Sequence, residues 1–300
     1  MHRRRDAPLT GRVEWGMLAR ERPPVTGLPS DSAVREAGPV HEGLGDMRED
    51  ELAGRLRHAL ETGQLVAYFQ PQYDLKTGRV VALEALCRWN DPDEGLLMPD
   101  RFIHLAEQHH LIADIGRVML EESGRRAADW HRRGVSVGLS LNVSPSELDA
   151  GFAGRVLRRI HELGLAPGDV TLEITESPAM RETDEEVGWL QELIDGGAGV
   201  SIDDFGAGHT SLDILRHVPF TELKIDRSLL ADPSEGVDAL VASAREIAHA
   251  RGARIVAEGI EDEKDLARVL AWGCDRGQGY HFSPPLPAEQ LGPVLESAAG

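Results

Sequence analysis

Cysteine is scarce in this chain of 300 residues, which contains only Cys87 and Cys274. A small disulfide-stabilised scaffold needs many more, so that class is excluded and a reducing compartment is favoured. Long apolar runs are also missing, because no segment approaches the roughly 18 apolar residues that a membrane-spanning helix needs. The arginines at positions 3–5 are not followed by the apolar stretch of a secretory signal. Together these absences favour a soluble cytoplasmic protein.

Positive charge is the second scarcity. The sequence has 32 Lys and Arg residues against 51 Asp and Glu residues, which gives a formal net charge of −19. Such a chain repels polyanions, so binding of polymeric nucleic acid is disfavoured. A small phosphate-bearing ligand stays compatible with this charge, because metal ions bridge carboxylates to phosphates. The hydrophobic fraction of 41% is sufficient for a folded core, which argues against global disorder.

The chain divides into a tail and a regular part. Residues 1–47 are rich in Pro, Gly and Ser without helical or strand periodicity, and are interpreted as a flexible tail or linker. Residues 48–300 are interpreted as one domain in which strands and helices alternate. The strands are expected at 65–70, 79–89, 135–143, 169–175, 199–203, 221–226, 254–257 and 274–282. The helices are expected at 49–62, within 99–133, and at 145–165, 184–194, 211–217, 237–251, 263–271 and 288–297.

This alternation predicts the fold class. Strands that alternate with helices form parallel sheets, and eight strands, each followed by helix, in about 250 residues match an α/β fold of the (β/α)8 TIM-barrel type. A doubly wound open sheet is the alternative fold. In a barrel, the reactive side chains lie at the carboxyl ends of the strands.

Polar side chains recur at those predicted strand ends. One such residue is readily explained as a solvated loop residue, but a series of strands that ends in oxygen ligands predicts a shared cavity. Converging carboxylates need a positive partner, and hard divalent cations with oxygen ligands are the simplest one. The residues are Glu84, Asn142, Glu173, Glu176, Asp203, Asp204, Lys224, Asp226, Glu258 and Gln278.

Two adjacent aspartates suggest more than one metal ion. Asp203 and Asp204 can point in different directions if the backbone turns there, which the glycines of the following segment permit. Two metal ions a few ångströms apart activate water and stabilise both oxygens of a phosphodiester that is being cleaved. Lys224 would orient that water or offset charge on the phosphoryl oxygens.

With these residues in place, the sequence resembles the EAL-domain phosphodiesterases that hydrolyse cyclic di-GMP. The name-giving motif is Glu84-Ala85-Leu86, and the other motifs follow in the family's order over roughly residues 50–295. They are Phe69-Gln70-Pro71, Asn142–Pro145, Glu173–Ser177, Asp203–Leu212, Leu223–Asp226, Ala257–Glu261 and Gly277–Phe282. The resemblance implies a barrel whose first strand is antiparallel, Mg²⁺ or Mn²⁺ as the cofactor at a two-metal site, inhibition by Ca²⁺, linear pGpG as the product and a homodimer.

The resemblance also implies a role for each matched position. Metal binding falls to Glu84, Asn142, Glu173, Asp203, Asp204 and Glu258, with Asp203 shared between two ions. The catalytic residues are Glu84, Lys224, which positions the attacking water, and Glu258, which is a candidate general base. Substrate contacts fall to Gln70, Arg88 and Gln278, with Arg88 reaching a phosphate. Glu176 anchors the loop after the fifth strand.

Some positions depart from the family pattern. Ala207 and His209 replace the usual Thr and Tyr in the loop after the fifth strand, where a changed rate or dimer strength is expected. Pro284 stands where many relatives carry a basic residue, and Cys87 is interpreted as core packing. The alternative function is a receptor module that binds cyclic di-GMP without cutting it, which the complete set of ligands disfavours. A protein-binding scaffold is the third hypothesis.

Overall fold

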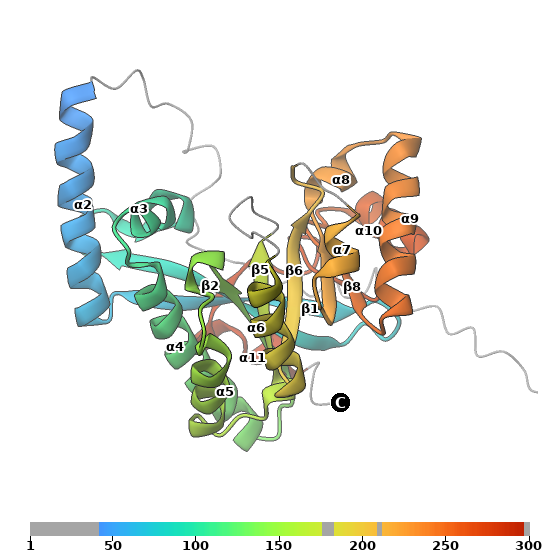
Figure 1. Cartoon of the computed structure of the whole chain (residues 1–300), viewed down its shortest axis with the longest axis horizontal. Coiled ribbons are helices and arrows are strands. Elements are labelled where there is room, and N and C mark those ends of the chain that lie inside the picture. The colour runs from blue at the N-terminus through green and yellow to red at the C-terminus, as the bar shows by residue number, and fades with distance from the viewer. Residues whose placement is uncertain (1–41, 176–182, 209–211, 297–300) are drawn as a thin grey trace, which may run out of the picture.

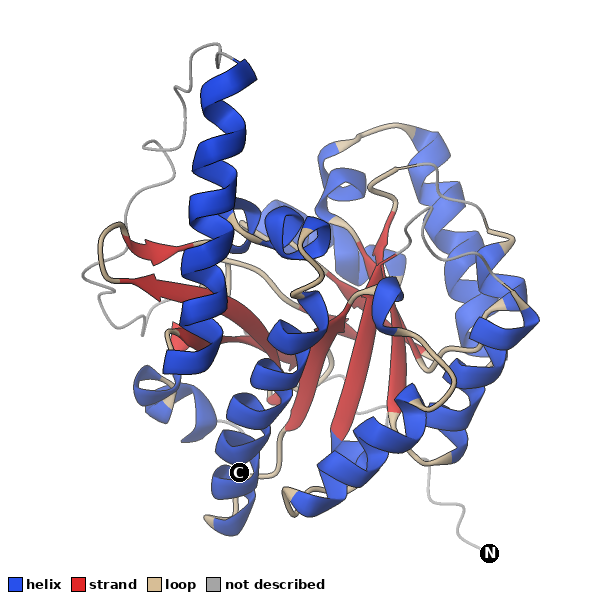
Figure 2. Cartoon of the chain, turned by 60° about the vertical axis from the view of Figure 1, so that its left-hand side comes forward, coloured by secondary structure: helices blue, strands red, loops and turns tan. Residues whose placement is uncertain are grey.

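A computed structural model describes residues 42–175, 183–208 and 212–296. Eight strands close into a barrel surrounded by helices, which confirms the TIM-barrel type (Figures 1 and 2). The barrel strands are β1 Leu65–Asp74, β2 Val80–Asp91, β4 Gly138–Val143, β5 Val170–Thr175, β6 Gly199–Phe205, β7 Glu222–Ile225, β8 Arg254–Ala257 and β9 Arg276–Gly277. Two short strands, β3 Gly95–Leu97 and β10 Leu286–Pro287, pair antiparallel with β2 and β1, respectively.

The helices pack around the outside of the barrel (Figure 2). They are α2 Glu42–Thr62, α3 Ile103–Gln108, α4 Ile112–Arg132, α5 Phe152–Glu162, α6 Asp184–Asp195, α7 Ile214–His217, α8 Arg227–Ala231, α9 Glu235–Ala250, α10 Glu263–Trp272 and α11 Gly292–Glu296. Within the described part of the chain, none of them combines the length and apolar character that crossing a bilayer requires.

The first strand is antiparallel to both of its barrel neighbours. β1 pairs antiparallel with β2 and with β9, whereas the pairs from β2–β4 through β8–β9 are parallel. The expectation that every strand is followed by a helix is therefore wrong for β1, which turns directly into β2. Asp74 causes this tight turn, because its Oδ1 accepts hydrogen bonds from the backbone N–H groups of Lys76 (3.1 Å) and Thr77 (2.7 Å).

Three expected boundaries also differ. α2 begins at Glu42 instead of residue 49, so residues 42–47 of the predicted tail are helical. The helix expected at 145–165 is a short 3-10 turn, Pro145–Glu147, followed by α5 from Phe152, because Leu148 is extended and Gly151 adopts a φ of +139°. The last barrel strand has only two residues, Arg276–Gly277, inside the longer expected range.

Alternation along the strands gives the barrel a polar interior. On β5, β6 and β7 the apolar residues alternate with polar ones, and the apolar residues belong to the hydrophobic core. The polar residues contact one another across the barrel in two layers. In the layer at the amino ends of the strands, Glu222 Oε2 accepts from Arg254 Nε (2.6 Å) and from Arg276 Nη1 (3.4 Å). The other layer carries the residues expected to be functional.

Candidate active site

A buried lysine lies at the centre of the expected site. Lys224 of β7 is 1% exposed, and its Nζ contacts four carboxylates that come from four different strands or strand ends. The distances are 2.8 Å to Glu173, 2.7 Å to Glu258, 3.1 Å to Asp203 and 3.5 Å to Glu84. One ammonium group therefore faces four carboxylates, and the site holds an excess of negative charge.

Strand register explains why these residues meet. Glu84 pairs with Ser140 on β4, Asn142 of β4 pairs with Glu173 of β5, and Asp203 of β6 pairs with Thr175 of β5. Because neighbouring parallel strands are staggered by only a few residues, the polar positions arrive at one level of the barrel. The sequence does not give the stagger of the strands. The recurrence of polar residues at predicted strand ends nevertheless indicates that these side chains converge.

Amide side chains complete the wall around Glu84. Asn142 Nδ2 donates to Glu84 Oε1 at 3.0 Å, and Gln278 Nε2 donates to Glu84 Oε2 and to Gln70 Oε1 (2.9 Å). Gln70 Nε2 donates in turn to the backbone oxygen of Ser283 at 3.1 Å. Two predicted metal ligands and two predicted substrate contacts are thus joined in one hydrogen-bonded chain.

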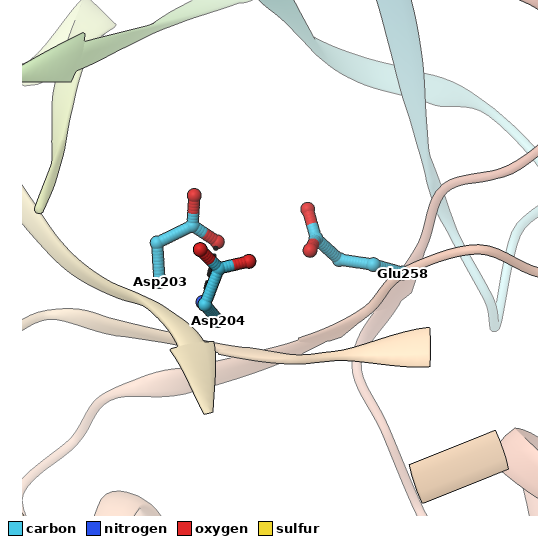
Figure 3. Close-up of side chains that lie close together, drawn as sticks. All are labelled: Asp203, Asp204 and Glu258. Atoms are coloured by element: carbon cyan, nitrogen blue, oxygen red, sulfur yellow. Dashed lines mark hydrogen bonds between the residues drawn. The ribbon is translucent and has the colours of Figure 1, made fainter. Parts of the chain in front are cut away.

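Two adjacent aspartates face a glutamate from the other side of the site. Asp203, Asp204 and Glu258 each offer a carboxylate oxygen within 4.8 Å of the others, and Figure 3 shows the three side chains turned toward one another. Asp204 adopts a left-handed φ of +58°, and its backbone N–H donates to Asp203 Oδ1 at 2.9 Å. The backbone thus turns at Asp204, in a conformation that aspartate tolerates better than most side chains.

Burial and mutual repulsion shift the acidity of this cluster. Burial raises the pKa of Glu258 to about 8 and that of Asp204 to about 6, with the neighbouring carboxylates adding to the rise and Lys224 opposing it. Burial also raises the pKa of Glu173 and Asp203. Burial acts on Glu84 in the same direction, but Lys224 and the amides of Gln278 and Asn142 hold its pKa below its ordinary value.

The donor set fits a divalent cation. Glu173 Oε1 and Gln278 Oε1 are buried and lack a hydrogen-bond partner among the described residues. Unpaired oxygens beside an excess of carboxylates are the ligands that Mg²⁺ and Mn²⁺ prefer. Of the predicted ligands, Asp203, Asp204 and Glu258 form the compact group, whereas Glu84, Asn142 and Glu173 adjoin it through Lys224 and the amide contacts.

A cavity of about 1410 Å³ opens above this cluster, at the carboxyl ends of the strands. Its wall includes Gln70, Glu84, Asn142, Asp204 and Gln278, among other residues. A cavity of this volume accommodates a ligand larger than a single nucleotide. Glu173 and Lys224 lie beneath the wall, with exposures of 0% and 1%.

Arg88, the predicted phosphate contact, makes its contacts outside the carboxylate cluster. It is buried, its Nη1 donates to the backbone oxygen of Cys87 at 2.8 Å, and its guanidinium lies 5.6 Å from the ring centroid of Tyr68. Its role in phosphate binding stays a prediction. Cys87 packs against the hydrophobic core, and burial raises the pKa of its thiol to about 12, which matches the packing interpretation. Glu176 and His209 lie outside the described residues.

The raised carboxyl pKa values predict how pH affects stability. The metal-free folded protein binds more protons than the unfolded chain between about pH 4 and pH 8, so its stability should fall as pH rises through this window. We expect the Tm in EDTA to fall by about 5 °C from pH 5.5 to pH 8.5. We expect the stabilisation by Mn²⁺ to grow over the same range, because the ion binds deprotonated carboxylates.

Thermal unfolding followed by circular dichroism measures both trends. The Glu258→Gln variant is the control, because it removes the group whose pKa is about 8 and should flatten the upper part of the EDTA profile. A metal-free Tm that rises from pH 5.5 to pH 8.5, or a Mn²⁺ effect that does not depend on pH, would contradict the prediction.

Comparisons with known proteins agree with this geometry. The profile of the EAL domain family matches residues 53–285. The bifunctional diguanylate cyclase/cyclic di-GMP phosphodiesterase MucR of Pseudomonas aeruginosa is 37% identical over 245 residues, which are 80% of this chain and 36% of MucR. The cyclic di-GMP phosphodiesterase NbdA of the same organism is 37% identical over 254 residues, 83% of this chain and 32% of NbdA. The chain thus spans about a third of the length of these curated relatives.

Solved structures give the same result. The phosphodiesterase part of PaMucR in complex with c-di-GMP superposes with a TM-score of 0.75 at 37% identity, and the match covers 80% of this chain and 99% of that one. The EAL enzyme Bd1971 in its form bound to cAMP and cyclic di-GMP also has a TM-score of 0.75, at 27% identity, covering 84% of this chain and 69% of that one.

Proposed function

The chain belongs to the EAL domain family, and on this premise we propose that it is a phosphodiesterase that hydrolyses cyclic di-GMP to linear pGpG. The observation that carries the proposal is the buried Lys224 surrounded by four carboxylates at the floor of the cavity. Relatives that cover this chain bear phosphodiesterase names, and a solved relative holds c-di-GMP. A receptor that only binds the nucleotide would not need this complete acidic set.

The acidic residues would hold two divalent ions. Asp203, Asp204 and Glu258 offer converging oxygens, and Glu84, Asn142 and Glu173 supply further ligands beside them. When bound, such ions activate water and stabilise the attacking and leaving oxygens of the phosphodiester. Mg²⁺ and Mn²⁺ both suit this oxygen-rich donor set.

The protein's own groups position the substrate and move protons. Lys224 keeps its proton, because the surrounding carboxylates hold its pKa well above its ordinary value, so it acts as a fixed positive charge that orients water and phosphoryl oxygens. Glu258 would accept a proton from the attacking water in its deprotonated form, which the positive charge of Lys224 favours and that of bound cations would favour further. Gln70 and Gln278 direct amide groups toward the cavity, where they bind the substrate.

A hydrolysis assay tests this function. The purified chain is incubated with cyclic di-GMP and Mg²⁺ or Mn²⁺, and the nucleotides are separated by chromatography. We expect conversion to pGpG that requires the metal and stops in EDTA. Intact cyclic di-GMP with both metals would refute the enzymatic function, and tight binding under those conditions would select the receptor alternative. A homodimer and a cytoplasmic location stay proposals that rest on the sequence.

A further inference from the structure

The cavity changes character away from the carboxylate cluster. On the side formed by α3, α4 and the end of β4, its wall is largely aliphatic and includes Ile103, Ile112, Met119 and Leu141. One partly buried carboxyl group enters this apolar part of the wall, that of Glu147 at the end of the 3-10 turn Pro145–Glu147. The function proposed above does not use this residue.

The position of the Glu147 side chain is fixed by two neighbours. Its Oε1 accepts a hydrogen bond from the backbone N–H of Ser144 at 3.0 Å. Its Oε2 lies against Gly116 of α4, so closely that a Cβ added at Gly116 would be 2.6 Å from this oxygen. Gly116 thus leaves room for the carboxyl group, and any other residue there would displace it.

Among the residues that the structure describes, Glu147 has no cationic partner. Burial raises its pKa to about 7, and the only opposing influence is the backbone hydrogen bond from Ser144. A structural carboxylate in an apolar wall normally pairs with Arg or Lys, because an unpaired buried charge is costly. Oε1 completes a capping box with Ser144 and so has a structural role, whereas Oε2 accepts no hydrogen bond from the described residues. An oxygen in that position at a cavity wall is suited to bind neutral N–H donors of a ligand.

We propose that Glu147 binds the Watson–Crick edge of a guanine base of the substrate. This inference rests on the proposed function, which brings two guanines into the cavity. The N1–H and N2–H groups of guanine are adjacent donors, and a carboxylate offers enough acceptor sites for them beside the Ser144 contact. Adenine presents a donor next to an acceptor at the same edge, so a carboxylate disfavours it.

The surroundings of Glu147 suit a base. Ile103, Ile112 and Met119 offer apolar contact to the faces of a flat ring, as in most ligand pockets. Hydrogen bonds are more discriminating where such walls exclude water, because an unmatched donor or acceptor then stays unpaired. Glu147 is therefore a specificity residue, separate from the residues that hold the scissile phosphate.

The Glu147→Gln variant tests the proposal. Glutamine has the same shape but one acceptor oxygen, so it cannot satisfy both the Ser144 N–H and the guanine donors. Glu246→Gln is the matched control, because Glu246 is exposed on the outer helix α9 and does not line the cavity. Cyclic di-IMP is the matched ligand, because its bases lack the N2 amino group and retain N1–H.

Binding is measured by calorimetry in Ca²⁺, and turnover is measured in Mn²⁺. We expect the wild type to prefer cyclic di-GMP, and Glu147→Gln to raise its Kd and KM about tenfold or more with little change in kcat. The preference over cyclic di-IMP should largely disappear, whereas Glu246→Gln should behave as the wild type. Thermal unfolding of both variants should match that of the wild type.

Other outcomes separate the two proposals. An unchanged ratio of the two Kd values in Glu147→Gln would overturn the base contact and leave only a structural role for this side chain. Absence of cyclic di-GMP binding by the wild type would overturn it as well. If the wild type binds with the expected guanine preference but shows no turnover in Mn²⁺, the base contact stands and the proposed hydrolysis fails.

Discussion

Changing Glu84 to glutamine is expected to reduce kcat for cyclic di-GMP at least about a thousandfold while the barrel stays folded. Glu84 contacts both the amide side chains of the site and the central lysine. It accepts from the amides of Asn142 and Gln278 and lies 3.5 Å from Lys224 Nζ. The glutamine side chain keeps the volume but loses the charge and one acceptor, so the metal loses a ligand and one amide donor loses its partner.

Steady-state hydrolysis at saturating Mn²⁺ measures this effect, and metal binding by calorimetry shows its origin. Glu246→Gln, a change of the same kind on the exposed surface of α9, is the control and should keep full activity. Glu84→Ala should be at least as inactive. Retention of more than about a tenth of the activity by Glu84→Gln would contradict the assignment of Glu84 as a metal ligand.

Changing Lys224 to methionine is expected to abolish hydrolysis and to lower the free energy of unfolding by about 3–5 kcal/mol at pH 8 without metal. The change leaves Glu84, Glu173, Asp203 and Glu258 in one buried site without their shared cation. Methionine fits the volume of the lysine stem, so the loss comes mainly from charge and not from a cavity.

The pH dependence distinguishes this cause from a packing defect. Carboxyl groups that lose their cation hold protons more tightly, so the loss of stability should be smaller at pH 5.5 than at pH 8. Mn²⁺ should restore part of the stability at pH 8, because it replaces the missing positive charge. Urea unfolding in EDTA measures these values, with Lys264→Met on the surface of α10 as control. A loss that is equal at both pH values would contradict the electrostatic explanation.

Many residues of the site could be predicted from the sequence, because they are acids and amides that recur at the ends of predicted strands. Four of the expected acids surround Lys224, and the amides of Asn142 and Gln278 contact one of them, Glu84. Asp226 instead caps α8, and Glu176 lies outside the described residues. The phosphate contact predicted for Arg88 stays a prediction, and its contacts with Cys87 and Tyr68 have no signal in the sequence. A guanidinium reaches over several ångströms, so its partners depend on the tertiary packing.

Other features had no usable sequence signal. Glu222, Arg254 and Arg276 form the second polar layer of the barrel, but each looks like an ordinary charged residue in its own strand. Glu147 lies in a range predicted as one long helix, and its spacing from Ser144 is that of a capping box, but its contact with Gly116 of α4 has no signal in the sequence. In both cases the feature is a contact between segments that are far apart in the chain.

The sequence alone determined the eight strands, the repeating acids and amides at their ends and the family resemblance, because these depend on local periodicity and on residue types at fixed spacing. Tertiary structure decided the β1–β2 hairpin, the central position of Lys224 among four carboxylates and the packing of the Glu147 carboxyl group against Gly116. The reason is physical: strand stagger and barrel closure set which side chains meet, and burial then sets their charge. Strand stagger and burial both depend on the whole fold, so a short stretch of sequence does not determine either of them.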